Sequence, residues 1–147
     1  MQDYVRNQYM KSAVTTADRG KLVVLLYEGA LNFLIRAKTS IEQGDIGGKC
    51  NNIDRTHDII QELNCSLNME EGGEIAKDLR SLYLFMERHL IKAKIDRDGT
   101  KKIDEVMSML STLYEAWAEI LKRPEVEQHL RQADNAMAQG MSHGFNI

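Results

Sequence analysis

Apolar residues recur at helical spacing along most of the chain, most clearly in the segment from residue 14 to residue 43. Leu22, Leu26 and Phe33 are separated by intervals that place them on one face of a helix. Asp18 lies where a carboxylate suits the positive end of a helix, and Gly44 is a typical residue at a helix C-terminus. The pattern predicts a helix over residues 17–43.

This first helix carries more apolar surface than a single packing seam requires. A second apolar flank lies beside the main stripe at about 100° per residue, formed by Val24, Tyr27, Leu31, Leu34 and Ile35. One explanation is a central helix that is buried on two sides. The other is a flank left open for a partner, and the pattern by itself leaves both open.

Three further segments have the same spacing and predict helices over residues 46–68, 74–96 and 100–121. The third helix has its own second stripe, formed by Leu84, Ile91 and Ile95. Short links between long helices make neighbouring helices antiparallel. We therefore expect an all-α fold, an antiparallel up-down four-helix bundle.

The two ends of the chain differ from this central part. Residues 1–13 are mostly polar but include Tyr4 and Tyr9, which suggests an N-terminal arm that packs against another surface. Beyond Pro124 a thin apolar stripe predicts a weaker fifth helix at the C-terminus. The expected organisation is an arm over residues 1–13, a helical bundle domain over 14–121, and a C-terminal helix and tail over 122–147.

The composition narrows the class of protein. The 147 residues include 43% hydrophobic residues and a single proline, which favours one folded helical domain. A net charge of −3 argues against nucleic acid as the main partner. No apolar run approaches the roughly 20 residues that cross a bilayer, and no signal-peptide core is present. We expect a cytoplasmic protein without membrane insertion.

A search for catalytic and metal-binding patterns gives no candidate. The nearest approach to a Glu-x-x-His metal motif is Asp54 with His57, which has no second copy and favours a hydrogen-bonded core histidine. Cys50 and Cys65 share one predicted helix at roughly 22 Å, too far apart to bridge, and are expected to be buried thiols. The sequence predicts no metal, no cofactor and no enzymatic activity.

A basic cluster surrounds the link between the third and fourth predicted helices. Its members are Lys92, Lys94, Arg97, Lys101 and Lys102. Part of it complements the negative C-terminal end of the third helix. The favoured interpretation is a solvated helix end. The less favoured one is a site at which an acidic partner docks.

An ordered set of residues along the chain follows a recognisable pattern. The set comprises Tyr9, Val14, Thr16-Ala17, Leu22, Leu25-Leu26-Tyr27, Gly29 and Ala37, then Ile59-Ile60-Gln61-Glu62-Leu63 and Leu67, then Leu82-Tyr83, Met86, Leu90 and Ala93, and finally Ile103, Glu105-Val106, Leu110, Leu113 and Ala116-Trp117. This set resembles the family of flagellar secretion chaperones called FliS, and the similarity covers about residues 4–121.

This resemblance implies a cytoplasmic export chaperone that binds the disordered C-terminal segment of flagellin and prevents premature polymerisation. Such a protein delivers its client to the flagellar type III export apparatus, where a component of the export gate binds the loaded complex. The resemblance also implies that an N-terminal arm, here with Tyr4, Tyr9 and Val14, covers a hydrophobic surface until the client displaces it.

The two second stripes are the expected flagellin contacts: Val24, Tyr27, Leu31, Leu34, Ile35, Leu84, Ile91 and Ile95. Their apolar surface suits a client that folds as it binds in a groove. The alternative is a structural homodimer without a client, in which these stripes pair two copies of the chain.

Overall fold

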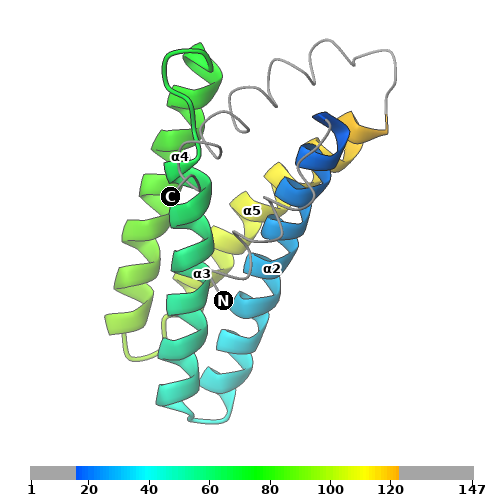
Figure 1. The fold of residues 1–147 in the computed structure, drawn as a ribbon. Coiled ribbons are helices and arrows are strands. Elements are labelled where there is room, and N and C mark those ends of the chain that lie inside the picture. Colours follow the sequence, from blue (N-terminus) through cyan, green and yellow to red (C-terminus); the bar gives the residue numbers. More distant parts are fainter. Residues whose placement is uncertain (1–15, 123–147) are drawn as a thin grey trace, which may run out of the picture.

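The computed structural model describes residues 16–122, and this part of the chain forms four helices and no strand (Figure 1). They are α2 (Thr16–Glu42), α3 (Ile46–Cys65), α4 (Gly73–Ile95) and α5 (Thr100–Leu121). Their bounds lie within three residues of those predicted from the apolar periodicity. None of these helices is long and apolar enough to cross a membrane.

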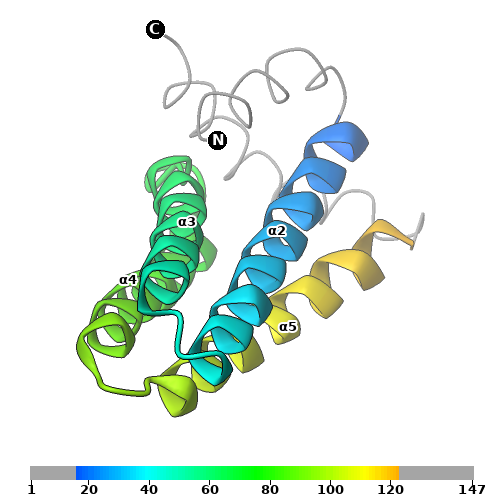
Figure 2. The same cartoon turned by 90° about the horizontal axis from the view of Figure 1, so that it is seen from below.

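The helices run alternately up and down, so that each is antiparallel to the next (Figure 1). Each helix packs on its neighbours in sequence, and α5 closes the bundle by packing on α2. Viewed along the bundle, α3 lies beside α4, and α2 lies beside α5 (Figure 2). The predicted four-helix bundle is therefore confirmed for residues 16–122. The predicted arm, with Tyr4, Tyr9 and Val14, and the predicted fifth helix lie outside the described residues.

Local sequence signals determine where the helices stop and start. Gly44 adopts a left-handed conformation with φ 70°, which ends α2. The Asp45 side chain then accepts a hydrogen bond from the Gly48 N–H at 2.9 Å and caps α3. Gly99, with φ 84°, lies against the Ala93 carbonyl, where a Cβ atom would clash. These short, well-defined turns hold neighbouring helices in contact.

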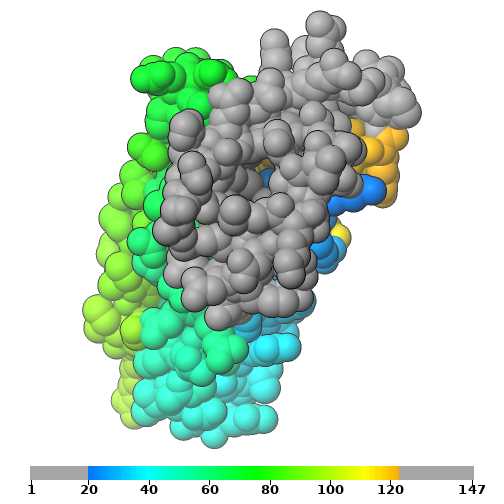
Figure 3. All heavy atoms as spheres, in the orientation of Figure 1, coloured from blue at the N-terminus to red at the C-terminus, as the bar shows by residue number. Residues whose placement is uncertain are grey.

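The core lies along the bundle axis and receives side chains from all four helices. Its largest fully buried members are Tyr27, Tyr83, Leu34, Ile53, Ile60, Leu63, Met86, Leu90, Ile103, Leu110 and Val23. In the space-filling view, α4 borders the left edge of the visible face, and α2 and α3 meet at its lower end (Figure 3). The core is complete without several large apolar residues that remain exposed.

Candidate binding surface

The second stripe of α4 is exposed. Leu84, Ile91 and Ile95 have 38%, 50% and 78% of their surface accessible. Their spacing of seven and then four residues places them on one side of the helix. This side faces outward near α3, because the neighbouring Lys94 contacts Asp54 of α3 at 2.7 Å. We call these three residues the α4 row.

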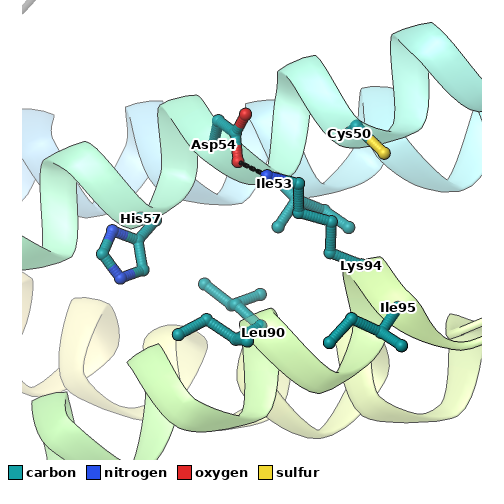
Figure 4. A pocket seen from close by; sticks show the side chains of 8 residues that line it. Cys50, Ile53, Asp54, His57, Leu90, Lys94 and Ile95 are labelled. Carbon is teal, nitrogen blue, oxygen red and sulfur yellow. Dashed lines mark hydrogen bonds and ion pairs between the residues drawn. The ribbon is translucent and has the colours of Figure 1, made fainter.

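A groove of about 510 Å³ lies between α3 and α4, beside the α4 row. It is lined by Cys50, Ile53, Asp54, His57, Leu90, Ile91, Lys94 and Ile95. Ile53 and Leu90 are buried and form its apolar base, while Ile91 and Ile95 form part of its exposed edge. Figure 4 shows Lys94 extending from α4 to Asp54 on α3. The groove therefore combines an apolar base with a charged edge.

Two of the polar groups at this groove, Asp54 and Lys94, form an ion pair between α3 and α4. The hydrogen bond from Lys94 to Asp54 raises the pKa of Lys94, which keeps the ammonium charged. His57 is half-buried and lines the groove, so its placement in the core was wrong. No group of three metal-ligating side chains occurs within residues 16–122. The groove suits an apolar ligand more than a metal or a reaction.

One carboxylate near the groove is unusual. The Oε1 atom of Glu87 is buried and has no hydrogen-bond partner among the residues that the structure describes. Glu87 lies four residues before Ile91, which places it one turn away along the same side of α4. An unpaired buried acceptor is unfavourable, and it would gain free energy from a donor that arrived with a ligand.

The second flank of α2 is mostly covered. Val24 and Leu31 are half-buried against the core, and Ile35 is 51% exposed. This flank lies next to α5. Glu28, which lies between Val24 and Leu31 on the same side of α2, accepts a hydrogen bond from the hydroxyl of Tyr114 on α5 at 2.7 Å. We call Val24, Leu31 and Ile35 the α2 row. Its surface is much smaller than the sequence pattern indicated.

The expected exposure of Tyr27 and Leu34 was wrong, because both are fully buried. The Tyr27 hydroxyl contacts the Tyr83 hydroxyl at 2.6 Å across the bundle, between α2 and α4. Burial raises the pKa of Tyr27 to about 12, and hydrogen bonds with Tyr83 and Trp117 partly oppose this shift. Both residues belong to the core and are not surface contacts in this structure. The physical reason is that α2 packs on both α3 and α5, which was the first of the two explanations for its wide apolar face.

The structure does not bring the two rows together. The α2 row lies beside α5, whereas the α4 row lies beside α3. Because α2–α5 and α3–α4 are separate sides of the bundle, one straight helical ligand cannot cover both rows (Figure 2). A ligand that contacted both would have to wrap around the bundle.

Other exposed apolar residues were missed or misplaced by the periodicity. Ile46 and Ile75 continue the apolar spacing of their helices but are 75% and 53% exposed. Both lie in the first turn of their helices, where a neighbouring helix no longer covers the stripe. Leu25 is 57% exposed and had no assigned role. Its position on α2, outside both apolar flanks, was a signal of exposure in the sequence.

The expectation that both cysteines are buried thiols was wrong. Cys50 is half-buried at the groove and Cys65 is exposed at the end of α3, so neither is a fully buried thiol. Both are free, as their separation along α3 predicted.

Comparison with known proteins identifies a family that this chain matches. Residues 1–124 match the model of the family described as flagellar protein FliS. The flagellar secretion chaperone FliS of Salmonella typhimurium is 36% identical over 120 residues, which are 81% of this chain and 88% of that protein. The Bacillus subtilis protein of the same name is 32% identical over 121 residues, 82% of this chain and 89% of its own length.

A third relative covers more of its own length. The flagellar secretion chaperone FliS of Campylobacter jejuni is 34% identical over 122 residues, which are 83% of this chain and 94% of that protein. A match of this extent to the family model and to its curated members identifies the fold and the general class. The chain belongs to the FliS family of flagellar secretion chaperones, which are not enzymes.

Proposed function

We propose that this protein binds the disordered C-terminal segment of flagellin in the cytoplasm, prevents its premature polymerisation and delivers it to the flagellar export apparatus. Membership of a secretion-chaperone family supports a client of the flagellum. The observation that carries the proposal is the α4 row, which stays exposed beside an apolar groove although the bundle core is already complete.

The client contacts are Leu84, Ile91 and Ile95 on α4, with Ile35 on α2. Val24 and Leu31 contribute only through their half-exposed edges. Tyr27 and Leu34 act indirectly, by holding α2 in the core. The positions of the two rows favour an extended client that wraps around the bundle as it folds. Coupled folding of this kind typically buries on the order of 1,000–3,000 Å².

Two further parts of the proposal concern regulation and delivery. An N-terminal arm with Tyr4, Tyr9 and Val14 covers the client surface until flagellin displaces it, and a component of the export gate binds the loaded complex. Both parts rest on the family resemblance. Removing residues 1–13 should strengthen flagellin binding if the arm competes with the client.

Co-purification provides the direct test. The purified chain should retain full-length flagellin and lose flagellin that lacks its C-terminal segment. Ile91→Asp and Ile95→Asp should each weaken the complex by about tenfold or more, because they place a charge in the apolar contact. Unchanged helical content and thermal midpoint in these variants would show that the fold is intact.

Leu25→Asp is the matched control, because Leu25 is as exposed as Ile91 but lies on neither row. Equal loss of binding in Leu25→Asp and Ile91→Asp would contradict the assigned surface. Leu31→Asp is a less selective test, because Leu31 is half-buried and its substitution also affects packing.

The competing function is a structural homodimer, in which the exposed rows pair two copies. Sedimentation of the isolated protein over a range of concentrations distinguishes the two. Under the chaperone proposal, Ile91→Asp changes flagellin binding and leaves the sedimentation coefficient unchanged. A dimer that this variant dissociates would favour the alternative.

A further inference from the structure

Positive charge without a partner accumulates at the end of the bundle where α4 meets α5. Lys92, Arg97 and Lys101 are exposed, and none of them has a carboxylate partner within residues 16–122. This contrasts with the whole chain, whose net charge is −3. We call Lys92, Arg97 and Lys101 the basic end, and Phe85 lies on α4 two turns before Lys92.

The acidic side chains near the basic end are already engaged. Asp96 pairs with Lys102, and Asp98 accepts a hydrogen bond from the Thr100 N–H at 2.8 Å. Glu105 contacts His89 at 2.5 Å, and Asp104 pairs with Lys38 of α2 at 2.6 Å. Two of these carboxylates, Asp96 and Asp104, are thus paired with other lysines. Asp98 accepts only from an uncharged N–H and stays ionised, so it offsets part of the positive charge of the basic end and leaves a net positive surface.

Helix stability does not explain all three charges. Lys92 lies in the last turn of α4, where a cation complements the negative helix end. Lys101 lies in the first turn of α5, which contains no acidic residue, and there the helix dipole disfavours a cation. Arg97 lies in the turn between the helices and has no ion-pair partner among residues 16–122. A local arrangement that works against stability is more typical of a functional surface.

An exposed aromatic residue lies on α4, further from the α4–α5 link than the three cations. Phe85 is 37% exposed and stacks on His89, with 4.8 Å between the ring centroids. His89 in turn contacts Glu105 of α5, four residues beyond Lys101. Lys92 follows Phe85 by seven residues, two turns along the same side of α4. The stack and the His89–Glu105 contact thus hold an apolar side chain about 10 Å along α4 from Lys92, a separation that an extended peptide can span.

From this arrangement we infer that the basic end is a docking surface for an acidic segment of a partner polypeptide, with Phe85 contacting an apolar side chain of that segment. The charge complementarity provides the attraction and the aromatic ring selects a peptide over a simple polyanion. The surface lies on the α5 side of α4, whereas the α4 row faces the α3 side. A partner at the basic end and a ligand in the groove can therefore bind together.

A labelled synthetic peptide tests this inference with the full-length protein. The probe is a twelve-residue peptide rich in Asp and Glu that contains two leucines, and a second probe has serine in place of leucine. Fluorescence anisotropy should show that the double variant Arg97→Gln/Lys101→Gln weakens binding of the leucine peptide by about tenfold. Phe85→Ser should weaken the leucine peptide about threefold and leave the serine peptide unchanged.

Lys77→Gln is the matched control, because Lys77 is an exposed lysine near the other end of α4. It should change peptide affinity by less than about twofold. The thermal midpoint of Lys101→Gln should be unchanged or higher, since the helix dipole no longer opposes a charge. A lower midpoint would assign Lys101 to the fold and overturn the inference.

Two further outcomes would also overturn it. One is equal peptide affinity in the wild type and in the double variant. The other is binding of a single-stranded oligonucleotide, or of vesicles containing phosphatidylglycerol, as tightly as the leucine peptide and with the same dependence on Arg97 and Lys101. That result would describe a general polyanion surface without selection for a polypeptide.

Discussion

The α2 row and the α4 row have the same spacing in the sequence and different positions in the structure. Val24, Leu31 and Ile35 are separated by seven and then four residues, as are Leu84, Ile91 and Ile95. On α2 the first two residues are half-buried beside α5, whereas all three on α4 are exposed beside the α3–α4 groove.

This difference shows that periodicity identifies a helix face but does not identify its neighbour. α2 packs on α3 and on α5, and its Tyr27 also reaches Tyr83 of α4, so its wide apolar face is used inside the bundle. α4 uses a narrower stripe for the same purpose. Its remaining apolar residues have no covering element within residues 16–122, and they are the strongest candidates for a client.

The largest expected effect is on the free energy of unfolding. Substitutions of two adjacent residues on α2 test which part of its second flank is buried. Leu34→Ala should lower the free energy of unfolding by about 3 kcal/mol, because it leaves a cavity in the core. Ile35→Ala should lower it by less than about 0.5 kcal/mol, because Ile35 is half exposed. Urea denaturation measures both values, and equal effects would contradict the assignment of Leu34 to the core.

Alkaline pH provides a second test of the same flank. Tyr27 keeps its proton in the folded state up to about pH 12, whereas a tyrosine in the unfolded chain loses it near pH 10. Between these values the unfolded state binds fewer protons, so the free energy of unfolding falls by up to about 1.4 kcal/mol per pH unit. Denaturation at pH 9 to 11.5 should show a smaller slope for Tyr27→Phe than for the wild type. An unchanged slope would indicate that Tyr27 is not the buried titrating group.

Two serine variants, one in each row, compare the α2 row and the α4 row directly. Leu31→Ser should lower the free energy of unfolding by about 1 kcal/mol and reduce flagellin binding only slightly. Ile91→Ser should change stability by less than about 0.5 kcal/mol and reduce flagellin binding more. Thermal denaturation and the co-purification assay provide the two measurements. The reverse order of binding losses would make the α2 row the main client surface.

The smallest expected effect concerns the ion pair at the edge of the groove. Asp54 and Lys94 are both largely exposed, so Asp54→Asn should lower stability at pH 7 by no more than about 0.5 kcal/mol. The raised pKa of Lys94 means that this contribution is complete below the ordinary lysine pKa and disappears as pH rises through the folded value. Asp58→Asn on the same helix is the control, and a larger loss from it would contradict the pairing.

The sequence predicted the four helices and their order, but it predicted only part of the candidate site. Leu84, Ile91 and Ile95 were selected from their spacing, and they are exposed. Tyr27 and Leu34 were selected by the same rule and are buried, because two additional helices cover that flank. The groove between α3 and α4 combines residues more than 30 positions apart, and no local pattern could have placed Cys50 and His57 beside Ile95.

Apolar periodicity, glycines at the turns and a capping aspartate were enough to determine four helices and their antiparallel order, because these features act over a few residues. The tertiary structure alone decided which apolar flank is covered, since coverage depends on helices that are distant in sequence. It also decided that Lys92, Arg97 and Lys101 have no ion-pair partner in the part of the chain that the structure describes, because Asp96 and Asp104 pair with Lys102 and Lys38. Local residue types determine the helices, and their packing determines which surfaces remain for partners.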